Sequence, residues 1–271
     1  MTQNSGNSPR LVAFQYRDFR LLWFGQIIST IGSNMQLIAV NWHIYELLRD
    51  EVYVLNLLGY TFDLNAGALG LGTLGLARVI PIILFALVGG MIADVFDRRR
   101  VMIWTNLTQT VVAALLSGIT FTGNDSVTAI YLLTSAGAAA AAFQQPAQQS
   151  LIPNLVPRKH LANAVSLNTL QWQSATIAGP ALAGVLVSIF SLGLVYAIDA
   201  LSFAGVIVAL LLMNYRSQGN NTNTTGLGWP AIVEGWKFTY NSELIWSTML
   251  LDFFATFFST ARPSSKYCGL N

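Results

Sequence analysis

Long uncharged stretches dominate the chain and predict helices that cross a membrane. A helix needs about 20 apolar residues to span the roughly 30 Å hydrocarbon core of a bilayer. Uncharged runs of this length far exceed a barrel strand and lack its two-residue alternation, so helices are favoured over a β-barrel. The pattern predicts six complete spans and a marginal seventh, at residues 21–46, 68–93, 101–122, 127–148, 163–188, 192–213 and 244–260.

Turn-forming and polar segments separate these spans. Gly123-Asn124-Asp125 and Ser191-Leu192-Gly193 predict tight turns, whereas residues 49–65 form a longer connection after the first span. Residues 214–243 form a linker that begins with the flexible, polar stretch "RSQGNNTNTTG". Its later stretch "WPAIVEGWKFTY" has apolar residues at helical spacing, which is typical of an interfacial helix or, more simply, of a juxtamembrane cap.

Composition and charge agree with an all-α membrane protein and predict its orientation. Of the 271 residues 54% are hydrophobic and 10% are charged. Ten basic residues lie before the first span or in the loops on the same side, against Arg49 alone in the opposite loops, so residues 1–20 and the even-numbered loops are predicted to be cytoplasmic. The ten are Arg10, Arg17, Arg20, Arg98, Arg99, Arg100, Arg158, Lys159, Arg216 and Lys237.

Other function classes find no support in the sequence. There is no P-loop pattern, no paired-histidine metal spacing and no G-x-S-x-G elbow, so we expect no enzyme activity, no cofactor and no bound metal. The single cysteine, Cys268, excludes an internal disulfide framework. A formal net charge of +2 gives no indication of a nucleic-acid partner.

A charged segment, "GGMIADVFDRRR" at residues 89–100, links the second and third predicted spans. Gly89 and Gly90 allow the end of the second span to approach a neighbouring helix closely. Asp94 and the three arginines can pair with one another or with helix termini. Simple positive-inside anchoring is the alternative, and it would require the arginines but not the Gly-x-x-x-Asp spacing.

This segment resembles the major facilitator superfamily of transporters, whose loop between spans 2 and 3 carries the pattern G-x-x-x-D-(R/K)-x-G-R-(R/K). Gly90, Asp94, Arg98 and Arg99 match it. Val95 stands where the family has a basic residue and Asp97 where it has glycine, so part of the implied charge network is altered. The candidate gating loop comprises Gly90, Asp94, Asp97, Arg98, Arg99 and Arg100.

Residues 143–186 are similar to the branch of the superfamily that contains the enterobactin exporter and related efflux proteins. In that branch span 4 ends in P-A-x-Q-(A/S)-x-(I/L)-P, and span 5 follows a short basic link. The matching residues are Pro146, Ala147, Gln149, Ser150 and Pro153. The stretches "FRLLWFGQIISTIGS" and "AIDALSF" also fit, and the resemblance covers roughly residues 17–259.

The stretch "ATIAGPALAG" at residues 175–184 is similar to the antiporter motif G-x-x-x-G-P-x-x-G-G of drug exporters. Gly179, Pro180 and Gly184 match, and alanines replace two of the glycines. Small residues at this spacing permit close helix contact, and Pro180 removes one helix hydrogen bond. Generic helix packing is the alternative explanation of the small residues. The resemblance implies export coupled to inward movement of protons.

The resemblance also implies a fold of two six-helix halves in a bacterial inner membrane, each half built from two inverted three-helix repeats, with the site between the halves. This chain would supply one half at residues 21–213 and a partial seventh helix at 244–260. The implied partners are lipid, a small-molecule substrate, protons and a missing C-terminal half. We expect a proton-coupled exporter of small amphipathic molecules of the drug or siderophore type. The alternatives are a non-transporting fragment or helix-bundle partner, and a half-size carrier that dimerises.

Three charged side chains lie inside predicted spans, where charge is costly unless it faces a cavity or a partner. Asp199 could be a proton site, because low-dielectric surroundings favour the neutral form of an acid. It could instead pair with Arg78 or accept hydrogen bonds between helices. Arg78 could hold an anionic substrate group, form an ion pair or extend to the outer face. Asp252 receives no role.

One side of the first predicted span is polar at three- to four-residue spacing, as expected for a helix that lines a central cavity. Hydrogen bonds between helices explain this spacing equally well. By resemblance, two neighbouring residues of the fifth span are further candidates for substrate contact, whereas His43 and Glu46 are expected at interfacial positions. The candidate cavity residues are Gln26, Ser29, Ser33, Gln36, Asn41, Trp172 and Gln173.

Residues 261–271, "ARPSSKYCGLN", are expected to be a non-native or frameshifted tail, because they would bring two positive charges to the outer side. Codons permitted for Ala261–Ser265, read two bases later, can encode the apolar stretch Thr-Ala-Leu-Leu. Resequencing the locus is therefore expected to find membrane-coding sequence downstream. An intact frame followed by no such sequence would contradict this expectation.

Overall fold

The computed structural model describes residues 11–57, 60–95 and 97–214, together with residues 240, 242, 246–248, 250–252 and 254–255. The chain divides into two compact units, residues 1–218 and 219–271. All the long helices belong to the first unit. In the predicted seventh span the described residues 246–248, 250–252 and 254–255 are helical, whereas the predicted tail and most of the predicted linker lie outside the described residues.

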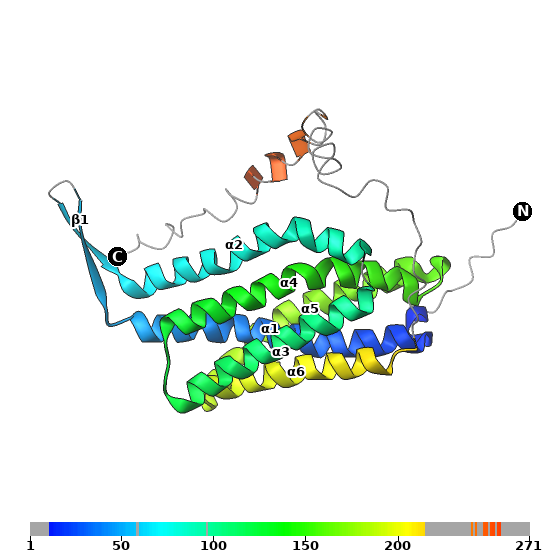
Figure 1. The fold of residues 1–271 in the computed structure, drawn as a ribbon, viewed down its shortest axis with the longest axis horizontal. Helices are drawn as coiled ribbons and strands as arrows, with labels where there is room; N and C mark the ends of the chain where they lie inside the picture. Colours follow the sequence, from blue (N-terminus) through cyan, green and yellow to red (C-terminus); the bar gives the residue numbers. More distant parts are fainter. Residues whose placement is uncertain are drawn as a thin grey trace, which may run out of the picture. The chain divides into compact units, whose positions relative to one another are not determined.

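Six long helices lie side by side in the first unit (Figure 1). They follow the six predicted spans to within a few residues, except that α4 continues from its predicted end at residue 148 to Leu155. The elements are η1 (Val12–Gln15), α1 (Arg17–Leu48), β1 (Val52–Leu57), β2 (Tyr60–Asn65), α2 (Ala66–Val95), α3 (Arg98–Thr122), α4 (Val127–Leu155), η2 (Arg158–His160), α5 (Leu161–Ile189) and α6 (Leu192–Leu212).

The turns agree in part with the sequence. Gly123 adopts a left-handed φ of 66° after α3 and its N–H bonds the carbonyls of Ile119 and Thr120, which is the αL cap that glycine favours. The second predicted turn is shorter than expected, because α6 begins at Leu192 and leaves only Phe190 and Ser191 between the helices.

An antiparallel hairpin of β1 and β2 occupies the connection after α1, with Val52 paired to Asn65 and Leu57 to Tyr60. The sequence predicted only a long connection there. Its residues are rich in valine, tyrosine, threonine and phenylalanine, which favour strands. Short strands of this kind lack the long uncharged run that marks a membrane span.

The helix contacts follow the symmetry of two three-helix repeats. The two repeats are α1 to α3 and α4 to α6, and exchanging them replaces α1 by α4, α2 by α5 and α3 by α6. Under this exchange the contact of α1 with α5 corresponds to that of α4 with α2, and the contact of α1 with α6 corresponds to that of α4 with α3. The fifth main contact, between α3 and α6, corresponds to itself. This arrangement is the one that the resemblance implied for the N-terminal half of a major facilitator protein.

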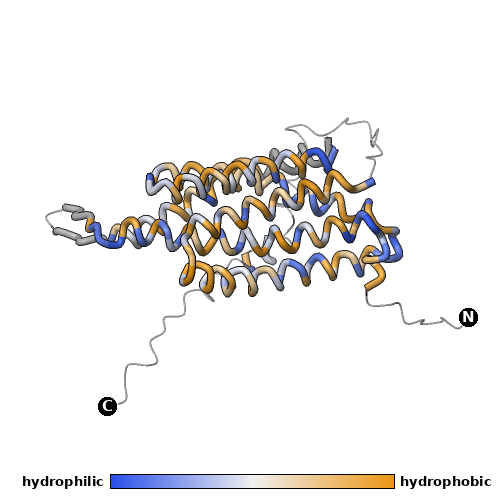
Figure 2. Tube along the Cα trace, turned by 90° about the horizontal axis from the view of Figure 1, so that it is seen from below, coloured by the Kyte–Doolittle hydropathy of each residue, from blue (hydrophilic) through white to orange (hydrophobic). Residues whose placement is uncertain are grey.

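Large apolar side chains cover the outside of the bundle, and hydrophobic residues predominate along the helices (Figure 2). Ile177 is 74% exposed, Leu201 72% and Trp104 68%. Such a surface is unfavourable in water and suits the acyl chains of a bilayer. Five helices, α2 to α6, are long and apolar enough to cross a membrane, whereas α1 is long enough at 32 residues but more polar.

A polar layer separates two apolar clusters inside the bundle. One cluster includes Phe19, Met102 and Leu151, and the other includes Ile44 and Leu116. On α1, α3, α4, α5 and α6, eight of the ten buried polar residues in the described part of the chain lie in sequence between residues of the two clusters, whereas His43 and Ser117 lie beside residues of the second cluster. The eight are Gln26, Ser29, Thr105, Asn106, Thr134, Gln171, Asp199 and Ser202.

Gly179 of α5 permits the close approach of α1. A Cβ at this position would collide with Asn34 and would lie 3.1 Å from the carbonyl oxygen of Ile31. A Cβ at Gly184, in the same motif and on the same helix, would meet nothing within 4 Å. The two glycines therefore have different packing roles, although both match the antiporter pattern. Pro180 lies inside α5, which continues without a break to Ile189.

Gly179→Ala is predicted to lower stability by about 1–3 kcal/mol, because overpacking forces α1 and α5 apart. Gly184→Ala is the matched control and should be neutral or slightly stabilising, since alanine favours helix more than glycine does. The measurement is the thermal unfolding midpoint of the detergent-solubilised chain. Equal losses in the two variants would contradict the packing described for Gly179.

Candidate functional site

A cavity of about 590 Å³ lies among the six helices, and each helix contributes to its wall. Helix α1 supplies a continuous polar strip between Gln26 and Gln36, and α4 faces it with residues between Thr134 and Gln149. Arg78 comes from α2, Val112 from α3 and Phe203 from α6. The other lining residues are Ser29, Thr30, Ser33, Asn34, Leu37, Ile82, Gln109, Gly137, Ala138, Ala141, Gln144, Gln145, Gln148, Asn168, Thr169, Gln171 and Trp172.

Carboxamides dominate the chemistry of this wall. Ten lining side chains are Gln or Asn, and Arg78 is the one formally charged side chain among the described residues of the wall. A carboxamide offers two N–H donors and a carbonyl acceptor. Apolar patches such as Trp172 and Phe203 interrupt the polar groups. The cavity can therefore accommodate a molecule that has many oxygen or nitrogen atoms and some apolar surface.

The structure places most of the predicted cavity residues on this wall. Gln26, Ser29, Ser33, Gln36 and Trp172 line it. Asn41 and Gln173 do not. Helix α1 leaves the cavity after Leu37, about one turn before Asn41, and Gln173 follows Trp172 by a rotation of roughly 100° that carries it off the lining face.

The glutamines of α4 are the main lining residues that sequence reasoning missed. In "QQPAQQ", Gln144 and Gln148 are four residues apart, as are Gln145 and Gln149, so each pair shares a helix face. That spacing could have identified them, although only Gln149 was considered, as part of a family pattern. The amide of Gln148 donates to Asn168 Oδ1 at 3.2 Å, and Gln171 donates to Thr30 Oγ1 at 3.1 Å.

Asp199 is fully buried between α6 and α1. The Ser202 hydroxyl lies 2.7 Å from the Asp199 carbonyl oxygen and 3.2 Å from Oδ1, whereas Oδ2 has no hydrogen-bond partner among the described residues. A Cβ on Gly32 of α1 would collide with Oδ1 and with the Ser202 hydroxyl. The carboxyl group therefore packs directly against the backbone of α1.

Of the alternatives that the sequence left open for Asp199, the ion pair with Arg78 is wrong, since no such pair is found within the described part of the chain. The reason is that the two helices that carry them, α2 and α6, are not packed partners. Arg78 instead faces the cavity.

The second repeat contains a counterpart of the contact between Gly32 and Asp199. Exchange of the repeats maps α1 onto α4 and α6 onto α3, and there a Cβ on Gly137 would lie 3.1 Å from Gln109 Oε1. Each contact brings a glycine against an oxygen-bearing side chain of the other repeat. The two contacts differ in chemistry, because the carboxylate of Asp199 can take up a proton and the amide of Gln109 cannot.

Arg98, Arg99 and Arg100 form the first turn of α3, whereas the sequence predicted that they lie in a loop. Asp97 caps α3, and its Oδ1 accepts from the N–H of Arg99 at 3.0 Å. Arg100 lies 3.9 Å from Asp97 Oδ2. The predicted spans left the seven residues 94–100 between these helices, whereas α2 ends at Val95 and α3 begins at Arg98, so the link is shorter than expected. Gly90 and Asp94 belong to α2, and their side chains lie outside the described residues.

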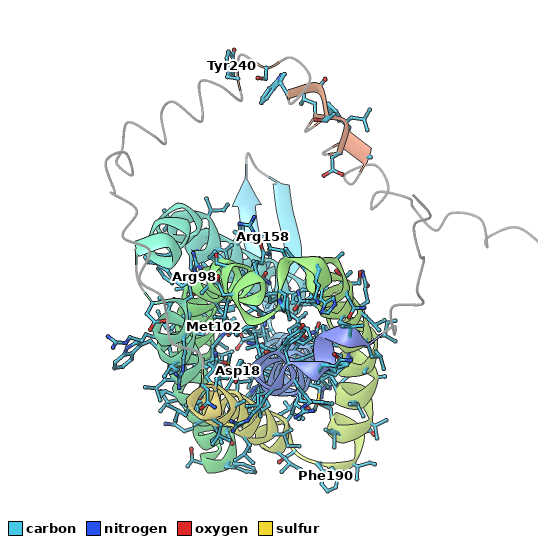
Figure 3. All side chains as sticks on the ribbon, turned by 90° about the vertical axis from the view of Figure 1, so that its right-hand side faces the viewer. Asp18, Arg98, Met102, Arg158, Phe190 and Tyr240 are labelled. Carbon is cyan, nitrogen blue, oxygen red and sulfur yellow. The ribbon has the colours of Figure 1, made fainter. Side chains whose placement is uncertain are left out.

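The guanidinium of Arg99 donates to the carbonyl oxygen of Leu211 at 3.1 Å, at the C-terminal end of α6. Carbonyls there lack helical partners, so a cation stabilises this terminus. The contact fulfils the expectation that these arginines pair with helix termini. Asp18, Arg98 and Arg158 mark the same end of the bundle, where α1, α3 and α5 begin (Figure 3).

Comparisons with known proteins agree with this geometry. The family model described as transmembrane secretion effector matches residues 8–264. An uncharacterized MFS-type transporter of Bacillus subtilis, YfiS, is 29% identical over 209 residues, which are 75% of this chain and 48% of the relative. The staphyloferrin A transporter of Staphylococcus aureus is 22% identical over 72% of the chain and 44% of its own length. Macrolide efflux protein A of Streptococcus pyogenes is 24% identical over 71% of the chain and 44% of its own length.

No solved structure gives a significant match. The chain spans about half the length of the curated relatives it matches. The family model nevertheless covers nearly the whole chain, and the repeat symmetry, the lipid-facing surface and the central polar cavity agree with it. The chain therefore belongs to the transmembrane secretion effector family of the major facilitator superfamily.

Proposed function

We propose that this chain forms the N-terminal, cavity-bearing half of a proton-coupled exporter of small molecules in a bacterial inner membrane. The observation that carries the proposal is the polar cavity of about 590 Å³ at the centre of a lipid-facing bundle. Polar groups inside a membrane are expensive and mark substrate or ion pathways. The proposal includes a C-terminal half that faces the cavity, as in superfamily members with two helix bundles.

The substrate in this proposal is a small amphipathic molecule of the drug or siderophore type. Ten carboxamides can exchange hydrogen bonds with an oxygen-rich surface, and Trp172 and Phe203 can contact its apolar parts. Arg78 adds one positive charge to a wall whose other described side chains are uncharged, which favours a substrate with an anionic or strongly polar oxygen. The names of the relatives, a staphyloferrin A transporter and a macrolide efflux protein, support this class.

Proton coupling is proposed at Asp199. An unpaired carboxylate in a buried layer is far more costly than the neutral acid. Because Asp199 packs against Gly32, its charge also affects the contact between α1 and α6. Taking up a proton would therefore stabilise one packing of the two repeats, and losing it would favour another. A shift of α1 changes the cavity, since α1 supplies a continuous strip of its wall.

The basic end of the bundle supplies a candidate gate, with Gly90, Asp94, Asp97, Arg98, Arg99 and Arg100 near the start of α3. The bond from Arg99 to Leu211 ties α3 to the end of α6. A helix of the facing half could compete for such contacts as two bundles rock about the cavity. The orientation, with this end in the cytoplasm, rests on the positive-inside rule.

A second candidate is a membrane bundle that does not transport by itself, because the chain spans about half the length of its relatives. Vesicles that contain the chain alone, or the chain with a C-terminal half taken from a full-length relative, distinguish the two. The proposal predicts efflux driven by a proton gradient in the second preparation. Absence of efflux from both preparations would favour the non-transporting candidate.

In the efflux-competent preparation, Asp199→Asn is predicted to abolish uphill, gradient-driven export and to retain downhill exchange, because asparagine fills the same space but cannot carry the proton. Ser202→Ala is the matched control, since it removes the neighbouring hydroxyl and leaves the carboxyl group. The measurement is accumulation of labelled substrate with and without an imposed pH difference. Full gradient-driven export by Asp199→Asn would exclude Asp199 as the coupling site.

A further inference from the structure

Arg78 is a cation on the apolar helix α2, and it lines the cavity. No ion pair or hydrogen bond joins it to another described residue. The described residues of the cavity wall include no Asp or Glu. A charge inside a membrane is costly unless it meets a group of opposite sign. Arg78 therefore requires an anion that the described residues do not supply.

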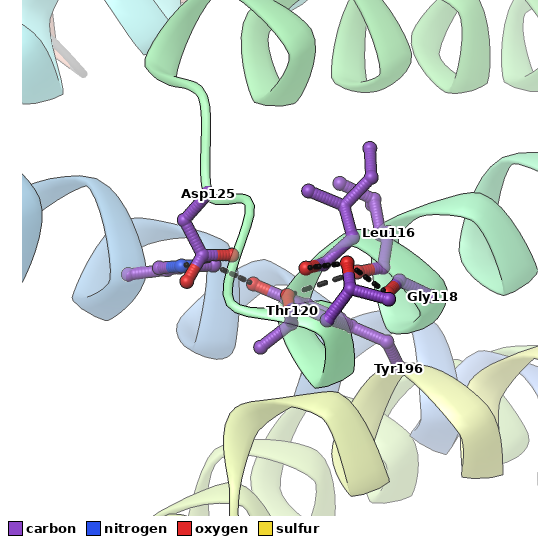
Figure 4. A network of polar contacts seen from close by, with 8 residues as sticks. Leu116, Gly118, Thr120, Asp125 and Tyr196 are labelled. Carbon is purple, nitrogen blue, oxygen red and sulfur yellow. Dashed lines mark hydrogen bonds and ion pairs between the residues drawn. The ribbon is translucent and has the colours of Figure 1, made fainter.

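The acid at the end of the bundle opposite the basic residues is held by a histidine. Nε2 of His43 lies 3.3 Å from Oδ1 of Asp125, and Nδ1 lies 3.2 Å from the Tyr196 hydroxyl. Asp125 and Tyr196 belong to the polar network shown in Figure 4. The side chain of His43 is 4% exposed, so its predicted interfacial position is wrong, because α6 and the turn before α4 cover the ring. Arg78 interacts electrostatically with Tyr196, whose hydroxyl is uncharged at neutral pH, and thus gains no counter-ion from this network.

A buried hydroxyl without a partner lies at the height of Arg78 in the bundle. Ser135 of α4 donates to the carbonyl oxygen of Ala77 at 2.8 Å, which places their sequence neighbours Thr134 and Arg78 at the same height. Thr134 is 7% exposed and lines the cavity, and its Oγ1 has no hydrogen-bond partner among the described residues. Gln109 of α3 lines the cavity beside the next turn of α4. A guanidinium, a hydroxyl and a carboxamide can all donate to one anionic group, and we call these three residues the arginine subsite.

Carboxamides gather at the other end of the cavity, toward the basic end of the bundle. Gln26, Gln148, Asn168 and Gln171 line both the cavity and a void of about 10 Å³ that reaches Phe19 of the first apolar cluster. Gln26 is 2% exposed, and its Nε2 has no hydrogen-bond partner among the described residues. A buried donor in this state is costly, so it favours a ligand that brings an acceptor oxygen. We call the four carboxamide residues the amide subsite.

The two subsites are far apart along the bundle. Thr134 of the arginine subsite and Gln148 of the amide subsite are separated by about four turns of α4, or roughly 21 Å. A cavity of about 590 Å³ that extends over this distance is narrow. A compact molecule cannot contact both subsites at once, whereas an extended molecule can.

We propose that the cavity binds an extended molecule with one anionic group, held by the arginine subsite, and a neutral oxygen-rich body, held by the amide subsite. This inference rests on the proposed export function and adds the shape, the charge and the orientation of the substrate. The anionic group points away from the basic end of the bundle. A cationic compound of the same size is disfavoured, because the described wall has a positive charge and no acid.

The two subsites can be tested with N-acetylated peptides of glycine and serine that end in a carboxylate, with peptides that end in an amide as neutral counterparts. Lengths from one to about six residues are used, because an extended chain gains about 3.5 Å per residue and six residues span both subsites. Titration calorimetry measures their binding to the detergent-solubilised full chain. We expect affinity to increase with length and carboxylates to bind about 10- to 100-fold more tightly than amides, as for a hydrogen bond to a charged group.

Variants assign each effect to its subsite. Arg78→Gln is expected to remove the preference for carboxylates, whereas Arg78→Lys, which keeps the charge, should retain part of it. Gln26→Leu should weaken long carboxylates and long amides alike and leave the shortest carboxylate unaffected, because only long peptides reach the amide subsite. Gln173→Leu is the matched control and should bind as the native chain does, since Gln173 lies off the lining face.

Three results would overturn the proposal and leave the cavity as the substrate site of the exporter. They are a carboxylate preference that is absent or survives Arg78→Gln, an affinity that does not depend on length, and loss of the preference when a C-terminal half is added. The last result would assign the counter-ion of Arg78 to that half. Absence of binding by every peptide would also overturn the two subsites, and the efflux assay then decides separately on export.

Discussion

Because lipid offers no hydrogen-bond partners, the bundle must shield from within the polar side chains of α1, the long helix that is not among the five apolar enough to cross a membrane. Helix α1 contacts α2, α4, α5 and α6, so its polar positions are largely shielded from the bilayer. Thr30, Ser33 and Asn34 donate to carbonyl oxygens of α1 itself, and Gln171 of α5 donates to Thr30. Gly179 and Gly32 let α5 and α6 approach closely enough to cover the remainder. The central position of α1 thus explains how a helix less apolar than the five membrane-spanning candidates can lie in a bundle that faces lipid.

The same arrangement divides the interior into layers that serve different purposes. Apolar clusters near the two ends hold the helices together, and the polar layer between them contains the cavity wall and Asp199. At one end, Arg99 ties α3 to α6, and at the other, His43 ties α1 to α6 and to the turn before α4. Helix α6 therefore takes part in both end contacts and carries the buried acid between them. A movement of α6 relative to α1 would change the two ends and the cavity together.

Much of the fold could be predicted from sequence, because a helix that spans a bilayer must have a certain length and an apolar composition. Both are directly visible as long uncharged runs. The polar strip of α1 was also visible, since Gln26, Ser33 and Gln36 recur at helical spacing within one segment. The contacts that surround the Asp199 carboxyl group could not be predicted from the sequence. Gly32 and Asp199 are far apart in sequence, and the pairing of α1 with α6 depends on the packing of all six helices. His43 likewise meets Tyr196 across 153 residues, which no local pattern encodes.

The central claim is that the polar strip of α1 and the glutamines of α4 face water at the centre of a bundle whose outside faces lipid. Its most direct test is the reactivity of single cysteines, introduced in a Cys268→Ser background, toward a small water-soluble thiol reagent applied to membranes from both sides. Cysteine at Gln36 or Gln149 is predicted to react readily, whereas cysteine at Trp104 or Leu201, on the apolar outside, should be protected. Protection at the two cavity positions, with reaction at the two outside positions, would contradict this account.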